Sequence, residues 1–113
     1  MTSADPAAEG RRRADEFLTL LAAEDPAADT LLEGLPGIRD LVFLGAGLTA
    51  IARAEGRMLP PAQRAQASTR QMSLGQLRDR SRRDVDGLRA WLRKSGEEIL
   101  FIRSLHAAQQ TSG

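Results

Sequence analysis

The sequence predicts an all-α fold, a small bundle of four to six helices with short loops. Apolar residues recur at spacings of three and four along most of the chain, and no segment alternates between apolar and polar as a strand would. A chain of 113 residues suits one core, so we expect a single α-helical domain over 1–113, with frayed ends at about 1–5 and 109–113. Because aromatic residues make up only 4% of the chain, that core must consist mainly of Leu and Ala.

Two cap-and-proline pairs predict where the first two helices begin. Asp5-Pro6 places a capping side chain before a proline at the first helical position, and the helical spacing then continues to about Glu24. Asp25-Pro26 repeats the device and predicts a short helix that runs to Glu33 and ends at Gly34.

The segment from Ile38 to Glu55 is the most apolar part of the chain and predicts a helix buried on most sides. One stripe contains Leu41, Leu44, Leu48, Ile51 and Ala52, and it is broadened by Val42, Phe43 and Ala46. A line of small residues, Gly45, Thr49 and Ala52, would let another helix approach closely. Gly56 and Pro60-Pro61 then end the segment.

The same segment contains the letters of a dinucleotide-binding fingerprint, with Gly45, Gly47 and Ala50 after an apolar run. A true fingerprint needs a second strand that ends in an acidic residue about twenty positions later. Residues 57–70 contain neither an acidic residue nor a strand pattern. A buried helix with a glycine-rich packing face is therefore favoured over nucleotide binding.

Three more helical segments are expected in the second half. Residues 63–72 form a polar pattern with few apolar anchors. Ser73 and Gln76 have the spacing of a capping box, which predicts a new helix over 74–94. Ser95-Gly96 predicts a break, followed by a last helix that carries Ile99, Leu100, Ile102 and Leu105.

Residues 73–92 resemble the helix-turn-helix of MerR-family transcription regulators. The matching positions are Leu74, Gly75, Leu77, Val85, Leu88, Arg89 and Trp91. The resemblance covers about twenty of the 113 residues and implies DNA binding. It departs from the pattern at three arginines: Arg78 replaces a small residue, Arg82 the glycine of the turn, and Arg83 a buried aliphatic residue.

The alternative is one unbroken amphipathic helix of about 30 Å. At 100° per residue its apolar residues form a single stripe, and Arg78, Arg82, Arg89 and Arg93 form a row along the edge of that stripe. This alternative explains the arginines and is favoured. A turn near Arg82 would decide between the two.

Charge is divided unevenly between the two halves of the chain. Residues 1–52 carry nine acidic and four basic residues, whereas 53–113 carry twelve basic and six acidic, giving −5 and +6 within a net charge of +1. The arginine row could pair with the acidic half, bind an acidic partner protein, or contact phosphates.

Composition argues against most catalytic and metal-dependent functions. The chain has no cysteine and one histidine, His106, so thiolate chemistry is excluded and a zinc site lacks ligands. No apolar run approaches the roughly twenty residues that span a bilayer. We expect no enzymatic activity, no cofactor, no metal and no membrane contact, and a cytoplasmic location.

The sequence therefore favours a non-enzymatic interaction protein: an adaptor, regulator or assembly factor that binds a protein partner through a helical face. A homodimer is expected, since small helices with few aromatic residues gain core by pairing. The candidate partner-binding residues are Arg78, Arg82, Arg89, Trp91 and Arg93. Trp91 is either an interface anchor or plain core. The alternative is a DNA-binding regulator that uses residues 73–92.

Overall fold

The computed structural model describes residues 6–111, which contain five helices and no strand. The helices are α1 (Pro6–Ala22), α2 (Ala27–Glu33), α3 (Ile38–Gly56), α4 (Pro61–Arg80) and α5 (Val85–Thr111). The predicted all-α bundle is confirmed. Residues 109–111 belong to α5, whereas residues 112–113 of the expected frayed end and the cap at Asp5 lie outside the described residues.

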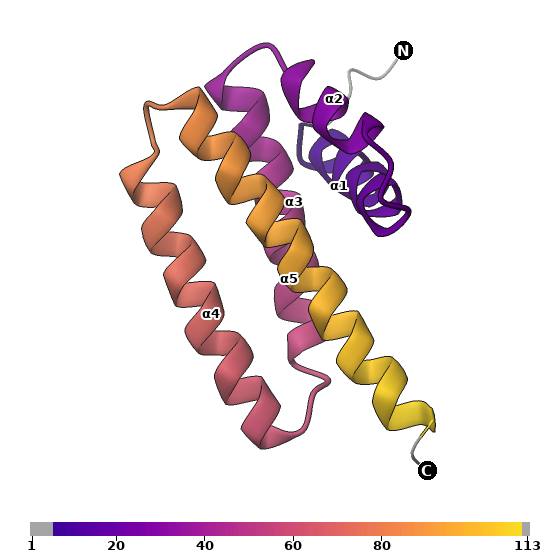
Figure 1. Cartoon of the computed structure of the whole chain (residues 1–113). Coiled ribbons are helices and arrows are strands. Elements are labelled where there is room, and N and C mark those ends of the chain that lie inside the picture. Colours follow the sequence, from indigo (N-terminus) through magenta and orange to yellow (C-terminus); the bar gives the residue numbers. More distant parts are fainter. Residues whose placement is uncertain (1–5, 112–113) are drawn as a thin grey trace.

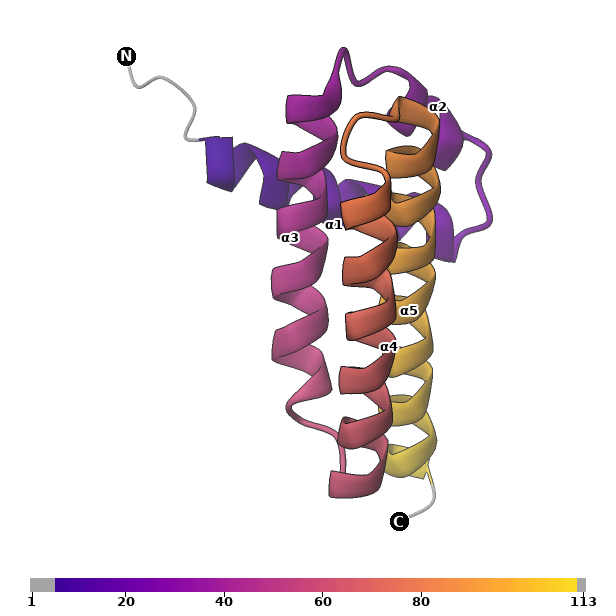
Figure 2. The same ribbon diagram turned by 90° about the vertical axis from the view of Figure 1, so that its left-hand side faces the viewer.

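The three longest helices, α3, α4 and α5, lie side by side (Figures 1 and 2). α4 runs antiparallel to α3, and α5 runs antiparallel to α4. α1 runs across α3 at a steep angle and packs mainly on it (Figure 2). α2 packs on α1. α4 packs on α5 more than on α3, and it lies on the opposite side of α5 from α1 and α2 (Figure 1).

The junction between α1 and α2 contains the one non-glycine residue with positive φ among those described. Glu24 has φ 54°, and the amides of Glu24 and Asp25 donate to the carbonyls of Leu21 and Leu20 at 3.0 Å each. These two bonds form a Schellman motif, which ends α1 two residues before the predicted Glu24. Asp25 Oδ1 then accepts from the Ala27 amide at 2.9 Å, in the capping role that the sequence predicted.

α3 has the predicted bounds to within one residue, and its predicted stripe is buried. Leu41, Leu44, Leu48, Ile51 and Ala52 are at most 3% exposed. The expected burial on most sides is wrong, because Val42 and Ala46 face outward.

The two glycines of the fingerprint lie in the middle of α3 and serve helix packing. A Cβ at Gly45 would overlap the indole of Trp91 on α5, and a Cβ at Gly47 would lie 2.9 Å from the carbonyl oxygen of Gly10 on α1. The two glycines therefore let α5 and α1 approach α3 closely from different sides.

The predicted boundaries in the second half are wrong at three places. Ser73 lies inside α4, and Ser95-Gly96 lies inside α5. The predicted continuous helix over 74–94 is interrupted by a turn over residues 81–84. Gly96 instead lies where α1 packs closely on α5: a Cβ there would lie 2.8 Å from atoms of Phe17 and Leu21.

The turn over 81–84 is held by short-range contacts that helical spacing does not encode. The Asp84 amide donates to the Ser81 carbonyl at 2.9 Å, and Asp84 Oδ1 accepts from the Asp86 amide at 3.1 Å, so Asp84 caps α5. Ser81 is buried against Gly87, where a Cβ would lie 2.6 Å from the Ser81 hydroxyl oxygen. Since α5 folds back antiparallel to α4, the pair is a helical hairpin, unlike the steeply crossed helices of a helix-turn-helix (Figures 1 and 2).

Candidate partner-binding groove

The turn over 81–84 divides the predicted arginine row between two helices and a loop. Arg78 lies near the end of α4, Arg82 lies in the turn, and Arg89 and Arg93 lie on α5. The prediction of a single row on one helix is therefore wrong.

Two arginines of that row face the acidic first half of the chain. Arg93 forms an ion pair with Asp29 of α2. Arg89 Nη2 donates to the Glu33 carbonyl at 3.4 Å, and Arg89 Nη1 lies 3.5 Å from the Asp86 carboxylate. Of the three interpretations of the row, intramolecular pairing fits these two residues. Both help to fasten α2 to α5.

Trp91 is only 4% exposed and belongs to the main core cluster, where its ring packs on Gly45. The core interpretation of this residue therefore describes its packing. The residue also lines the floor of a groove between α3 and α4. It is thus a buried residue at the base of an open surface feature.

This groove, the α3–α4 groove, has a volume of about 720 Å³. Its walls come from the second half of α3 and from α4, and Trp91 of α5 lies at its base. The lining residues are Thr49, Ala52, Arg53, Gly56, Arg57, Arg64, Ala67, Ser68, Gln71, Met72, Leu74, Gly75, Arg78 and Trp91. Small and apolar residues form the floor, and Met72, which is 66% exposed, lies at the edge.

Four arginines and no acidic residue line the α3–α4 groove. Within residues 6–111, Arg53 and Arg64 make no ion pair, and Arg57 donates only to the Arg53 carbonyl, at 3.2 Å. Arg78 lies 3.3 Å from the carboxylate of its neighbour Asp79. Three guanidinium groups of the groove are therefore without a carboxylate partner in the described part of the chain.

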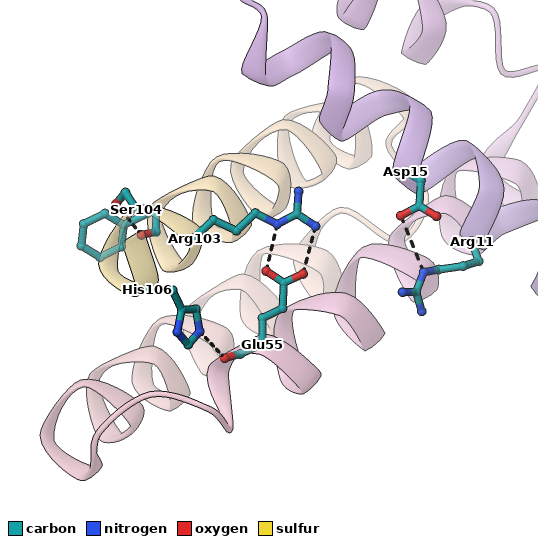
Figure 3. Close-up of polar contacts among 7 residues, drawn as sticks. Arg11, Asp15, Glu55, Arg103, Ser104 and His106 are labelled. Atoms are coloured by element: carbon teal, nitrogen blue, oxygen red, sulfur yellow. Dashed lines mark hydrogen bonds and ion pairs between the residues drawn. The ribbon is translucent and has the colours of Figure 1, made fainter. Parts of the chain in front are cut away.

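Glu55 is the one acidic residue between positions 41 and 78, and its carboxylate points away from the groove. Arg103 of α5 donates to both of its oxygens at 2.9 Å, and these bonds raise the pKa of Arg103 (Figure 3). His106 Nε2 lies 2.9 Å from the Glu55 carbonyl oxygen (Figure 3). Arg103 and His106 of α5 thus hold the last turn of α3. The Glu55 carboxylate is the nearest in sequence to Arg53 and Arg57. It is already paired with Arg103.

A second ion pair between helices, partly buried, fixes α4 on α5. Arg70 Nε donates to both oxygens of Glu98, at 2.7 and 2.9 Å, and its guanidinium carbon lies 4.9 Å from the centre of the Phe101 ring. Glu98 is 9% exposed, so this contact is largely shielded from water. This ion pair matters because Ala67 is the one buried residue of α4, so few other contacts hold this helix in place.

Sequence reasoning did not single out Arg53, Arg57 and Arg64. The available signal was the near-absence of acidic residues between 41 and 78, where five arginines stand against Glu55. Arg53 comes from the end of α3, Arg57 from the α3–α4 connection and Arg64 from the first turn of α4, so no single helical pattern contains all three.

The described residues contain no group of three or more His, Asp or Glu side chains that could hold a metal ion. Over the same part of the chain, none of the helices has the length and hydrophobicity needed to cross a bilayer. Comparison with known proteins gives no match, whether to a protein-family model, a curated protein or a solved structure.

Proposed function

We propose that this chain is a non-enzymatic interaction protein that binds an acidic amphipathic helix of a partner protein in the α3–α4 groove. It would act as an adaptor, regulator or assembly factor. The observation that carries the proposal is the combination of an apolar floor with four arginines and no acidic residue in one groove.

The shape of the groove favours a helix as the occupant. α3 and α4 both lie along α5 and run antiparallel to each other (Figure 2). The α3–α4 groove is lined by residues 49–57 on one side and by residues 64–78 on the other, so it follows the direction of the two helices. From Arg64 to Arg78 the α4 wall is about 21 Å long, the length of a helix of about 14 residues. Amphipathic helices bind such grooves through apolar anchors spaced three and four residues apart.

The charge of the groove favours acidic residues beside those apolar anchors. Guanidinium groups pair with carboxylates in bidentate geometry, and such charge-assisted bonds are stronger than neutral hydrogen bonds. Because Arg53, Arg57 and Arg64 have no carboxylate partner among the described residues, an acidic partner would not have to displace an internal ion pair.

The test uses Trp91, the only tryptophan of the chain, as the reporter. A synthetic helix of about 14 residues, with leucine at helical spacing and glutamate on both sides of the leucine stripe, is titrated into the protein. We expect saturable binding seen as a change in Trp91 emission, and binding about tenfold or more weaker for Arg53→Gln/Arg57→Gln/Arg64→Gln.

The matched control is Arg80→Gln/Arg82→Gln/Arg83→Gln, which removes the same charge from exposed arginines outside the groove. This variant should bind the peptide within about twofold of the unaltered protein. Equal loss of binding in the two triple variants would mean that net charge, rather than the groove, attracts the peptide. No binding at all would reject the proposal.

DNA binding through residues 73–92 is the second candidate. The turn over 81–84 and the exposed Arg82 and Arg83 favour it. The antiparallel arrangement of α4 and α5 does not (Figure 1). A gel shift with random duplex at low salt tests it, and no shift would remove it.

The homodimer likewise remains a proposal, and the mass in solution by light scattering tests it. If a second copy of the chain binds in the α3–α4 groove, light scattering should show a dimer that dissociates when the peptide is added.

A further inference from the structure

We propose that the α3–α4 groove is directional. It would hold its helix parallel to α3, with an acidic carboxy-terminal turn at Arg53, Arg57 and Arg64 and an apolar anchor at Leu74 and Trp91. This inference rests on the proposed function and adds the orientation and the sequence pattern of the partner.

The unpaired arginines gather at one end of the groove. Arg53 lies in the last turn of α3 and Arg57 is the residue that directly follows the helix; because they are four residues apart, they lie on one face. Only residues 57–60 connect α3 to α4, and Arg64 lies in the first turn of α4. The three guanidinium groups therefore share the end of the groove nearest this connection.

Leu74 and Trp91, the apolar residues of the proposed anchor, lie toward the other end of the groove. Trp91 packs on Gly45, which lies about 18 Å from Arg57 along the axis of α3. Leu74 and Gly75 line the same end from α4, and a Cβ at Gly75 would meet nothing within 4 Å. Arg78 at this end is already close to the Asp79 carboxylate.

The carboxy-terminal end of a helix carries a partial negative charge on its free carbonyl groups. Placed beside Arg53, Arg57 and Arg64, this end and its acidic side chains would both be attracted. In the reverse orientation the partial positive charge of the amino-terminal end would face the same three cations. The carbonyl end of a bound helix can also accept hydrogen bonds from guanidinium groups.

The experiment compares two peptides that have the same composition and the same leucine stripe, each acetylated at its amino terminus and amidated at its carboxy terminus. One has three glutamates in its last turn, and the other has them in its first turn. We expect the first to bind about three- to fivefold more tightly to the unaltered protein. Arg53→Gln/Arg57→Gln/Arg64→Gln should remove this difference. The two peptides can differ in helicity when free, but each peptide has the same free state in both titrations. The affinity ratio measured with the unaltered protein is therefore compared with the ratio measured with the triple variant.

Orientation is read directly by a nitroxide placed at either end of the first peptide. A label at the amino-terminal end should quench Trp91 more strongly than one at the carboxy-terminal end. Equal quenching, the reverse order, or equal affinities for the two peptides would overturn the directional inference and leave the proposed function standing. Absence of binding by both peptides would instead overturn the proposed function.

Discussion

The indole of Trp91 on α5 lies against the backbone of α3 at Gly45, so closely that a Cβ at position 45 would overlap the ring. This contact sets how near α5 can come to α3, and it places the only tryptophan at the base of the α3–α4 groove. Packing and the candidate binding surface therefore depend on the same pair of residues.

Gly45→Ala should destabilise the fold by about 1–3 kcal/mol, because the new methyl group displaces the indole. Helix propensity alone would give the opposite sign, since alanine is favoured over glycine by about 1 kcal/mol. Urea denaturation followed by circular dichroism measures the free energy of unfolding, and Trp91 emission should shift in the same variant.

Gly75→Ala is the matched control. Gly75 lies within α4 and a Cβ there has no neighbour within 4 Å, so this variant should gain about 0.5–1 kcal/mol. Equal effects of the two substitutions would contradict close packing of Trp91 on Gly45.

Glu24→Gly should stabilise the protein by about 0.5–1 kcal/mol, because glycine adopts the left-handed conformation of position 24 without steric strain. Thermal or urea unfolding measures the effect. Glu16→Gly, on the exposed face of α1, should instead cost about 1 kcal/mol. A loss of stability in Glu24→Gly would show that the Schellman motif is not the conformation that ends α1.

Arg70→Met should destabilise the protein by about 1–3 kcal/mol, since it leaves the Glu98 carboxylate buried without its partner. Arg70→Met/Glu98→Leu should recover most of this loss, because the uncompensated charge is gone. Denaturation of both variants gives the comparison, with Arg80→Met as the exposed control. A double variant less stable than Arg70→Met would contradict this account.

Salt should weaken binding of the acidic peptide, because the guanidinium groups of the groove are exposed and their attraction is screened over about 8 Å at physiological ionic strength. Titrations of Trp91 emission at increasing salt should therefore show a steady loss of affinity. The loss should be shallower for Arg53→Gln/Arg57→Gln/Arg64→Gln. A salt-independent affinity would mean that only the apolar floor attracts the peptide.

The sequence by itself determined the fold class and the first three helices. Local features carry that information: Asp25 caps α2, Gly34 ends it, and the apolar stripe of α3 has one helical period. Composition, too, was sufficient to argue against thiolate and zinc chemistry. The helix signals depend on residues within a few positions of one another, and composition does not depend on position at all.

Only the tertiary structure decided where the second half of the chain turns. Apolar spacing through Leu77, Ser81 and Val85 is compatible with a continuous helix, so the break depends on the contact of Ser81 with Gly87 and on the cap by Asp84. Gly96, which suggested a break, lies inside α5, at a place where Phe17 of a distant helix leaves no room for a side chain. The α3–α4 groove has the same origin: a chain reversal, rather than a sequence pattern, brings Arg53, Arg57 and Arg64 to one end and Trp91 to the other, since the faces of three helices meet only when the chain is folded.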